Sequence, residues 1–416
     1  MTGPPILVVT PTFTPEKVGT PHYIGDLVAA LVERGQTVEV VCQQPYYPEF
    51  QRYPGYGRSR RHDQVHGATV HRLPTIVPRG GSFAWRAVSE LNFLLQIALR
   101  RLLRRLPTST RVIGVSPGAP FVVLAAALLT ARRGRLVALI HDIQTGLFPD
   151  HGRLARLRPL AASIERRCLE RADHLTVLSI GMSDELRRNG VTRPITVEPI
   201  WATVGATDAA EEQGTVLYSG NLGRKQGVGT LLDLAGRLRV SAPDARVVIR
   251  GQGSEREDVA DGIRSRGLDN VALEDLVPVE QLADSLACAA VHVVPQLPTG
   301  ATAAMPSKIY NILAVGRPLV AVAAPDSGIR DLAAQTGGIV CVPPDDLDAL
   351  ERAVVGLLHD DEQRRARGAE GAAYVRDHRS RAASAARYAA LATHGDQPER
   401  GAVRSVPGAH RGPASG

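Results

Sequence analysis

The alternation of short apolar runs with longer amphipathic runs constrains the fold of this chain more than any other feature of its sequence. Short runs rich in valine, isoleucine and leucine are typical of buried strands, and stretches with helical periodicity separate them. Two series of strands are predicted, at 6–10, 38–42, 70–73, 112–115, 136–140, 175–178 and 195–198, and then at 215–219, 246–250, 271–273, 291–294, 319–322 and 339–342. The clearest helices are predicted at 21–34, 161–171, 228–240, 255–266, 279–287, 307–315, 347–358 and 380–393. This pattern indicates a parallel α/β architecture.

The two series of strands are separated by a small, polar stretch at 202–214, which lacks apolar periodicity and is typical of a linker. We predict an N-terminal Rossmann-like domain at 1–201 and a C-terminal one at 215–376, followed by a helix at 377–394. Residues 395–416 are rich in glycine, proline and arginine and are predicted to be disordered. Doubly wound domains bind ligands at the carboxyl ends of their strands, so we expect the active site in the cleft between them.

Composition excludes several classes of protein. The chain has 416 residues, of which 44% are hydrophobic and 22% charged, as in ordinary soluble domains. Its four cysteines are isolated from one another, so neither a disulfide framework nor a zinc site is indicated. The apolar start stops at Pro11, which favours a strand over a signal peptide, and the uncharged stretch at 112–131 is broken by prolines and a glycine. We therefore expect a cytoplasmic protein without a membrane-spanning segment.

Lysine is rare in this chain and occurs only in loops that contain glycine or proline. Among 49 basic residues the lysines are Lys17, Lys225 and Lys308. A lysine acts as a compact point charge at a phosphate, a role that arginine does not simply replace. The loop 220–227 is rich in glycine and carries Arg224 and Lys225 directly before a helix, a pattern that favours a diphosphate site over a solvated connection.

A second loop–helix junction also carries a lysine. Pro306 and Ser307 are typical of a helix start, and Lys308 follows them. The dipole of a helix disfavours a cation at this end, and a bound anion would remove the conflict. We therefore predict phosphate binding here as well.

The first domain contains a glycine and a His–Asp pair in loops that follow its predicted strands. Gly19 opens an amphipathic helix after a proline-rich loop, so it serves either helix entry or the approach of a ligand to the backbone. His141 and Asp142 follow the strand at 136–140, where they would point into the cleft, although a structural His–Asp pair is an equal alternative. The sequence contains neither GxGxxG nor GxxxxGK[ST], which argues against a dinucleotide site and a P-loop.

An aromatic loop and a basic helix in the first domain suggest further partners. The loop places five aromatic residues close together, namely Tyr46, Tyr47, Phe50, Tyr53 and Tyr56. Such rings stack on sugars or bases, and the absence of an RNA-binding signature argues against nucleic acid. The run 84–106 is amphipathic and carries four arginines, Arg100, Arg101, Arg104 and Arg105, in a chain of net charge +7. Such a helix either rests on an anionic membrane surface or packs on the first sheet.

Seven motifs together resemble a known family over about residues 5–393. They read PEKVGTPHYIGDLV, GQTVEVVCQQPYYPEF, IHDIQ, LERADHLTVLSIGM, YSGNLGRKQG, GQGSE and MPSKIYNILAVGRP. In this order and spacing they resemble the family-4 retaining glycosyltransferases of the GT-B fold. Within that family the chain most resembles bacterial transferases of exopolysaccharide and O-antigen assembly, including the colanic-acid and fucosamine transferase types.

The resemblance implies a nucleotide-sugar donor bound to the C-terminal domain and a last helix that crosses back to the first. Catalytic roles fall to His141, Arg224, Lys225 and Lys308. Together with the residue patterns above, the resemblance assigns substrate contacts to Gly19, Tyr46, Tyr47, Asp142, Gly220, Asn221, Gln226, Leu276, Val277, Met305, Pro306 and Ser307. In this assignment the cations hold the donor diphosphate, His141 lies near the transferred sugar, and Leu276 and Val277 frame the base.

The chain departs from the family pattern at four positions. Many relatives carry two glutamates where this chain has Ala303 and Asn311, and often an arginine and a lysine where it has Asn221 and Gln226. Because one of these glutamates usually contacts the hydroxyls of the sugar, the identity of the donor sugar is left open.

These observations predict a retaining, metal-independent glycosyltransferase with a nucleoside diphosphate sugar as co-substrate and no cofactor. The acceptor is predicted to be a polyprenyl-diphosphate-linked glycan, met at the inner face of the plasma membrane. Two alternatives stay open. A sugar-nucleotide epimerase shares this architecture but needs acid–base carboxylates, of which only Asp142 is well placed. A non-catalytic subunit of a polysaccharide-assembly complex would fit Ala303 and Asn311.

Overall fold

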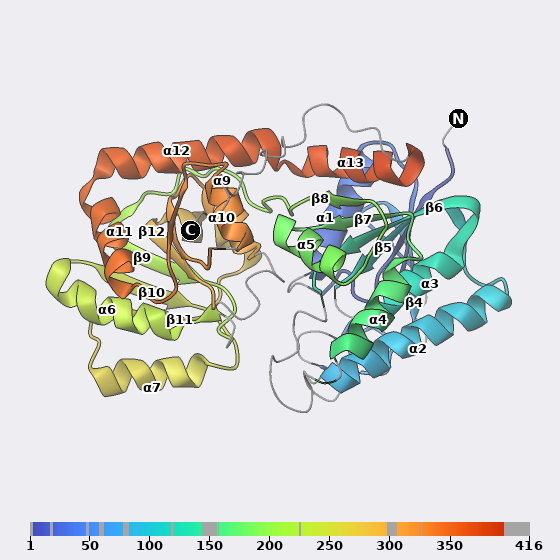
Figure 1. Ribbon diagram of the computed structural model, residues 1–416, viewed down its shortest axis with the longest axis horizontal. Helices are drawn as coiled ribbons and strands as arrows, with labels where there is room; N and C mark the ends of the chain where they lie inside the picture. The colour runs from blue at the N-terminus through green and yellow to red at the C-terminus, as the bar shows by residue number, and fades with distance from the viewer. Residues whose placement is uncertain are drawn as a thin grey trace, which may run out of the picture.

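The computed structural model describes residues 3–16, 20–46, 50–57, 62–77, 83–117, 120–143, 156, 158–223, 226–297, 306–325 and 327–394. Within these residues the chain forms one eight-stranded and one six-stranded sheet, each flanked by helices (Figure 1). All strand pairings are parallel except one at an edge of the larger sheet. The two doubly wound α/β domains predicted from the sequence are therefore present. No described helix combines the length and the apolar character that crossing a membrane requires.

The larger sheet belongs to the N-terminal domain and has the strand order β3-β4-β2-β1-β5-β6-β7-β8. Its strands are β1 (Ile6–Val9), β2 (Val38–Gln43), β3 (His62–Val65), β4 (Ala68–Leu73), β5 (Ser109–Ser116), β6 (Thr130–Ile140), β7 (His174–Val177) and β8 (Ile195–Val197). The helices are α1 (Thr20–Glu33), α2 (Phe83–Leu102), α3 (Phe121–Leu129), α4 (Arg158–Leu169) and α5 (Ile180–Arg188). The central strand β1 is buried throughout, as expected for a parallel strand covered on both faces.

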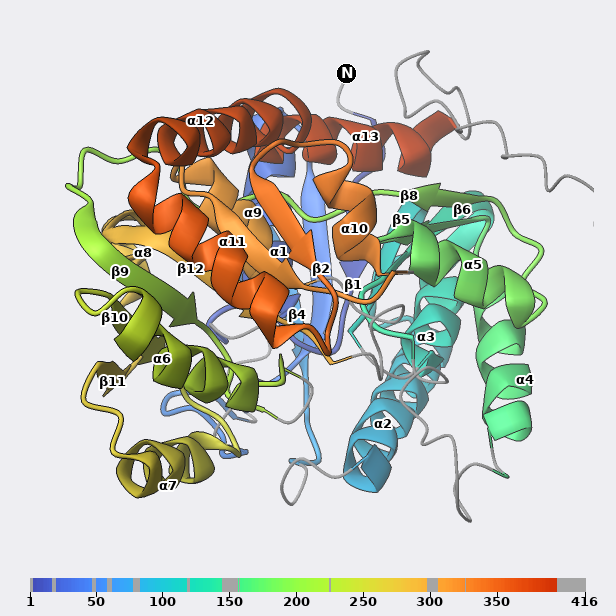
Figure 2. The same cartoon turned by 60° about the vertical axis from the view of Figure 1, so that its left-hand side comes forward.

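Successive residues of β1 divide the N-terminal core into two layers, because side chains alternate across a sheet. Leu7 and Val9 pack in one cluster with residues of α2 and α3, whereas Ile6 and Val8 pack in the other with residues of α1. Helices therefore cover both faces of the sheet (Figures 1 and 2).

The smaller sheet belongs to the C-terminal domain and has the strand order β11-β10-β9-β12-β13-β14. Its strands are β9 (Glu212–Ser219), β10 (Arg246–Arg250), β11 (Val271–Glu274), β12 (Ala289–Pro295), β13 (Leu319–Val322) and β14 (Ile339–Val342). The helices are α6 (Gly229–Ser241), α7 (Arg256–Arg266), the 3-10 helix η4 (Val279–Gln281), α8 (Leu282–Ala287), α9 (Lys308–Ala314), α10 (Gly328–Ala333), α11 (Leu347–His359), α12 (Asp361–His378) and α13 (Arg381–His394).

The structure contains two helices, α10 and α12, that the sequence prediction lacks, and it differs from the prediction at three further places. β3 is absent from the predicted strands because three of its four residues are polar and all are at least partly exposed, which an edge strand tolerates. β6 begins six residues before the predicted start at 136, since the stretch TARRGR carries no apolar pattern. The predicted linker extends too far, because residues 212–214 belong to β9, where the amide of Glu212 donates to the carbonyl of Cys288 at 2.8 Å.

The last two helices join the domains. α12 contacts α9 in the C-terminal domain, and α13 packs against α1 of the N-terminal domain, so both run along the same side of the molecule (Figure 2). Arg381 pairs with Asp26 and Glu33 of α1. Ser384 and Arg387 bind the buried carboxylate of Glu198 at 2.5–2.8 Å. The chain therefore returns to its first domain at its described end. The tail at 395–416 lies outside the described residues.

Candidate functional site

The ammonium group of Lys308 lies against the backbone of the loop that follows β9. A Cβ added to Gly220 would lie only 2.6 Å from Nζ of Lys308 and 2.9 Å from its Cε. Gly220 also has φ +144°, a conformation that other residues rarely adopt. Glycine at this position therefore makes room for the lysine, which brings the two predicted phosphate-binding junctions together.

The Lys308 ammonium has no hydrogen-bond partner among the described residues, although Nζ itself is enclosed. It lies 3.8 Å from the centre of the Tyr218 ring, a cation–π contact, and the Tyr218 hydroxyl donates to the carbonyl of Asn221 at 2.6 Å. Burial lowers the pKa of Lys308 to about 7. An enclosed cation without a carboxylate is costly, so this position is suited to receive an anion.

The loop after β9 rests on the loop after β10. A Cβ on Gly251 would come within 2.0 Å of the Gly220 carbonyl oxygen, and the Leu222 amide donates to the Gln252 carbonyl at 2.8 Å. The motif GQGSE therefore supports the Lys308 site by close backbone packing, a role that the sequence prediction did not assign. Asn221 is exposed and Gln226 half-buried beside this loop. Arg224 and Lys225 lie outside the described residues.

His141 follows β6 at the carboxyl edge of the N-terminal sheet. Its amide donates to the Ser116 carbonyl at 3.1 Å, and its Nδ1 lies 3.3 Å from the hydroxyl of Thr20, the first residue of α1. Burial lowers the pKa of His141 to about 4, so the imidazole is neutral at pH 7. Asp142 is half-buried beside it. Thr20 was not predicted, and nothing but its place after Gly19, which lies outside the described residues, could have indicated it.

The loop after β1, like the loop after β9 the first of its domain, contains a buried carboxylate. Glu16 is 3% exposed and accepts hydrogen bonds from the amides of Phe13 at 3.1 Å and Tyr46 at 2.9 Å. Tyr46 is itself only 9% exposed, so most of its ring is enclosed. Tyr47 lies outside the described residues. In the N-terminal domain the Glu16 carboxylate is therefore the hydrogen-bond acceptor of these two backbone amides.

Two contacts join α9 to the N-terminal side of the molecule. Ser307 lies close to Tyr23 of α1, and burial raises the pKa of Tyr23 to about 12. Asn311 is buried, and its Oδ1 accepts from the amide of Thr203 in the linker at 2.8 Å. Asn311, one of the departures from the family pattern noted above, therefore binds the linker. Ala303 and Met305 lie outside the described residues, and Pro306 is half-buried directly before Ser307.

The residues predicted to frame the base lie at the far edge of the smaller sheet. Leu276 is 47% exposed and Val277 half-buried, just after β11. They follow the carboxyl end of that strand, the same edge on which Gly220 follows β9. The structure thus places an accessible apolar surface at this edge.

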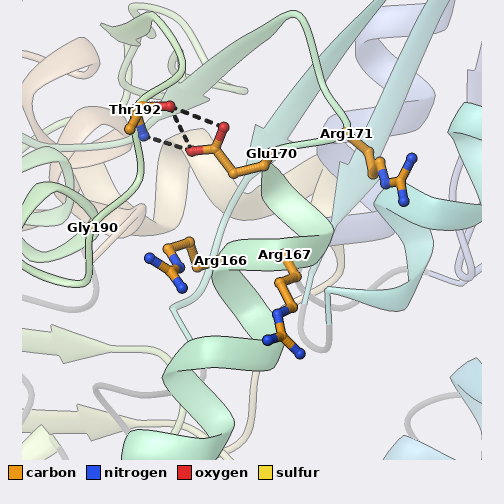
Figure 3. Close-up of a pocket in the computed structure, with 6 residues that line it drawn as sticks. All are labelled: Arg166, Arg167, Glu170, Arg171, Gly190 and Thr192. Atoms are coloured by element: carbon orange, nitrogen blue, oxygen red, sulfur yellow. Dashed lines mark hydrogen bonds between the residues drawn. The ribbon is translucent and has the colours of Figure 1, made fainter.

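A hollow of about 450 Å³ lies apart from these residues, at the C-terminal end of α4 (Figure 3). Its lining residues are Arg166, Arg167, Glu170, Arg171, Gly190 and Thr192. Glu170 accepts from the amide and the hydroxyl of Thr192, at 2.6 and 3.0 Å. None of the predicted site residues lines this hollow.

Comparison with known proteins identifies the family. Residues 18–201 match the family described as Glycosyl transferase 4-like domain, and residues 213–360 match Glycosyl transferases group 1. Over 372 residues the chain is 30% identical to the Escherichia coli (strain K12) protein WcaI, which is named as a colanic acid biosynthesis glycosyl transferase. That alignment covers 83% of this chain and 90% of WcaI. The chain belongs to the family-4 glycosyltransferases of the GT-B fold.

Solved structures share the fold of this glycosyltransferase at low sequence identity. Sucrose-phosphate synthase of Thermosynechococcus elongatus has a TM-score of 0.73 at 18% identity, covering 93% of this chain and 98% of that one. Anabaena HepE in complex with UDP-glucose has a TM-score of 0.66 at 14% identity, covering 93% and 98%. WaaG, a glycosyltransferase of lipopolysaccharide biosynthesis, has a TM-score of 0.65 at 13% identity, covering 94% and 100%. The glycosyltransferase therefore has the two-domain GT-B architecture expected from its motifs.

Proposed function

We propose that this glycosyltransferase moves a hexosyl or amino-sugar group from a nucleoside diphosphate sugar to a polyprenyl-diphosphate-linked glycan, with retention of configuration, in the biosynthesis of a cell-surface polysaccharide. The observation that carries the proposal is the enclosed Lys308 ammonium, which has no hydrogen-bond partner among the described residues and lies against Gly220. A donor diphosphate is the anion that a glycosyltransferase would place there.

Lys308 would stabilise the diphosphate as the sugar–oxygen bond breaks. Negative charge grows on the leaving phosphate oxygen in that step, and a preorganised cation in a site shielded from water stabilises it strongly. Arg224 and Lys225 would add charge from the preceding loop. Because side-chain cations would supply the charge, we propose that the reaction needs no metal ion and no cofactor.

His141 would act on the sugar rather than on the diphosphate. Its neutral ring can hydrogen-bond a sugar hydroxyl, while Thr20 holds Nδ1 in place from α1. Asp142, Gly19, Asn221 and Gln226 stay predictions for substrate contacts, and Leu276 with Val277 for the base. The arrangement would put the donor on the C-terminal domain and the acceptor on the N-terminal one.

The proposed acceptor class and location follow from relatives and from chemistry. WcaI is named for colanic acid biosynthesis and WaaG for lipopolysaccharide biosynthesis, both of which are cell-envelope glycans. A glycan built on a polyprenyl diphosphate is held at a membrane, so we propose that the protein works in the cytoplasm at the inner face of the plasma membrane. HepE binds UDP-glucose, which supports a uridine nucleotide as the first donor to test.

The test is a thermal-shift screen of nucleotide sugars, followed by transfer to a polyprenyl-diphosphate-linked acceptor with and without EDTA. A donor present at 100 times its Kd should stabilise the fold by about 2.7 kcal/mol. We expect one nucleotide sugar to stabilise the protein and to yield an α-linked product from an α-linked donor, with EDTA having no effect. Turnover of the nucleotide sugar without acceptor would indicate the epimerase instead, and binding without turnover would indicate a non-catalytic subunit.

A further inference from the structure

The helix α2 carries aliphatic residues on two opposite sides, and only one side is covered. Phe93 and Ile97 are fully buried in the core against the N-terminal sheet. On the other side Val88, Leu91, Leu95, Leu99 and Leu102 are between 44% and 80% exposed. At 100° per residue these five positions form one continuous stripe that faces away from the core. Soluble proteins seldom expose a contiguous row of this kind without a partner.

Positive charge surrounds the C-terminal end of this stripe. Arg101, Arg104 and Arg105 are exposed there, and Leu103 between them is 50% exposed. Arg100 is half-buried and donates to the Gln96 carbonyl at 3.4 Å. Among the side chains of α2 that the structure describes, the acidic one is Glu90, which is 8% exposed on the covered side. Aliphatic residues next to exposed arginines complement an anionic lipid surface, which offers both acyl chains and phosphates.

Another helix of the same layer also exposes aliphatic side chains. α3 packs between α2 and α4, and all three lie on one face of the N-terminal sheet (Figures 1 and 2). α4 exposes Leu160 and Ile164, which are 61% and 39% exposed. These are spaced by one helical turn, so they lie on one side of their helix.

The stripe also begins close to the edge of the sheet that carries the site. Nε2 of Gln43, the last residue of β2, donates to the carbonyl of Ser89 in α2 at 3.1 Å. The second turn of α2 therefore lies at the carboxyl ends of the strands, the edge at which His141 follows β6. A surface that starts there would hold this edge near the plane of a bilayer.

We propose that the exposed stripe of α2, with Arg101, Arg104 and Arg105, docks the protein on an anionic phospholipid bilayer. The inference rests on the proposed function for its purpose, because a lipid-linked acceptor would be met at this surface. The docking itself involves no substrate. Insertion of the leucines provides the apolar contribution, and the arginines provide a contribution that salt screens.

The test is flotation of the full-length protein with vesicles of phosphatidylcholine alone or with 30% phosphatidylglycerol, at low and high salt. Wild type should float with the anionic vesicles, less so at high salt, and hardly with the neutral ones. Leu95→Glu with Leu99→Glu should weaken binding about tenfold or more, and Arg101→Glu with Arg104→Glu and Arg105→Glu should abolish the dependence on salt. Val240→Glu is the matched control, because Val240 is an 85% exposed aliphatic residue on α6 of the other domain.

Three outcomes would overturn the docking proposal: failure of wild type to float, equal flotation of the α2 variants, or a loss of flotation shared by Val240→Glu. Sedimentation velocity covers the alternative occupant, since a dimer that the leucine variant dissociates would make a second copy the partner. Folding of each variant is checked by its melting temperature and by its stabilisation with the donor. Flotation without transfer would contradict the proposed function alone, and transfer to a soluble acceptor without flotation would contradict this inference alone.

Discussion

The first loop of each domain follows the first strand of its sheet, yet the two loops have opposite electrostatic environments. After β1, the Glu16 carboxylate is buried and accepts two backbone hydrogen bonds. After β9, the loop lies against the buried Lys308 ammonium, which has no hydrogen-bond partner among the described residues. In the N-terminal domain the Glu16 carboxylate thus accepts hydrogen bonds from its own backbone. In the C-terminal domain the Lys308 ammonium lies beside the loop without an anion among the described residues. The comparison teaches that two domains with the same fold can place opposite charges beside the loop that follows their first strand.

The largest effect that this comparison predicts is on donor turnover. Lys308→Met removes the charge beside Gly220 and should cost about 2–4 kcal/mol in kcat/KM, as expected when a preorganised group that stabilises developing charge is lost. The measurement is initial-rate kinetics with the donor found in the screen. Arg246→Met is the control, because Arg246 lies at the opposite end of β10 with a 57% exposed side chain. Equal rates for wild type and Lys308→Met would contradict the assignment of the donor diphosphate to Lys308.

The second prediction separates the chemistry from donor binding. His141→Ala should lower the single-turnover rate about 10²-fold while leaving donor affinity nearly unchanged, because its contact with the sugar would count mainly in the transition state. Since the pKa of His141 is about 4, its protonation should contribute no change in rate between pH 5 and 8. Calorimetry and rapid-quench transfer measure the two quantities. A collapse of affinity with an unchanged rate would make His141 a binding residue.

The buried Glu16 carboxylate should contribute to the stability of the fold rather than to donor binding. Glu16→Ala leaves two buried amides without their acceptor and should lower the free energy of unfolding by about 1–3 kcal/mol. Glu16→Gln retains one acceptor and should cost less. Glu33→Ala is the control, because its carboxylate is 62% exposed and forms a surface ion pair. Urea denaturation measures the stability. An altered Kd for the donor in a folded Glu16 variant would contradict a purely structural role for Glu16.

The smallest effect is a pH dependence of donor affinity that should come from Lys308. The pKa of Lys308 is about 7 in the free protein, and a bound diphosphate would raise it. Donor affinity should therefore be constant below about pH 7 and fall by up to tenfold per pH unit above it, and Lys308→Met should abolish this slope. Calorimetric titrations from pH 6 to 9 measure it.

The same pKa predicts the stability of the free protein. An unfolded lysine has a pKa near 10.4, so the folded state binds fewer protons between about pH 7 and 10.4. The cost of burying Lys308 is therefore complete below pH 7 and declines as the pH rises. Lys308→Met should raise the melting temperature of the free protein at pH 7, and the gain should shrink towards pH 10. A gain that grows with pH would contradict the enclosed, unpaired ammonium.

The sequence by itself determined most of the elements and their order, but it did not indicate the helices α10 and α12. Apolar runs are the local signal of buried strands, so the strands of both parallel sheets could be predicted, whereas the polar edge strand β3 carries no such signal. The sequence also singled out Lys308 and His141, because both follow recognisable strand or loop patterns. It did not predict that Lys308 packs directly on Gly220, since residues far apart in the chain become neighbours only when the sheet forms.

Tertiary structure alone decided how charges and apolar faces are paired. Periodicity shows that α2 is amphipathic, but only packing shows that Phe93 and Ile97 are covered while Leu95 and Leu99 are exposed. The sequence likewise shows an asparagine in place of a family glutamate, and only the fold shows Asn311 bound to the linker amide of Thr203. The physical reason is that hydrogen bonding and burial depend on distances across the folded chain, which local sequence patterns do not contain.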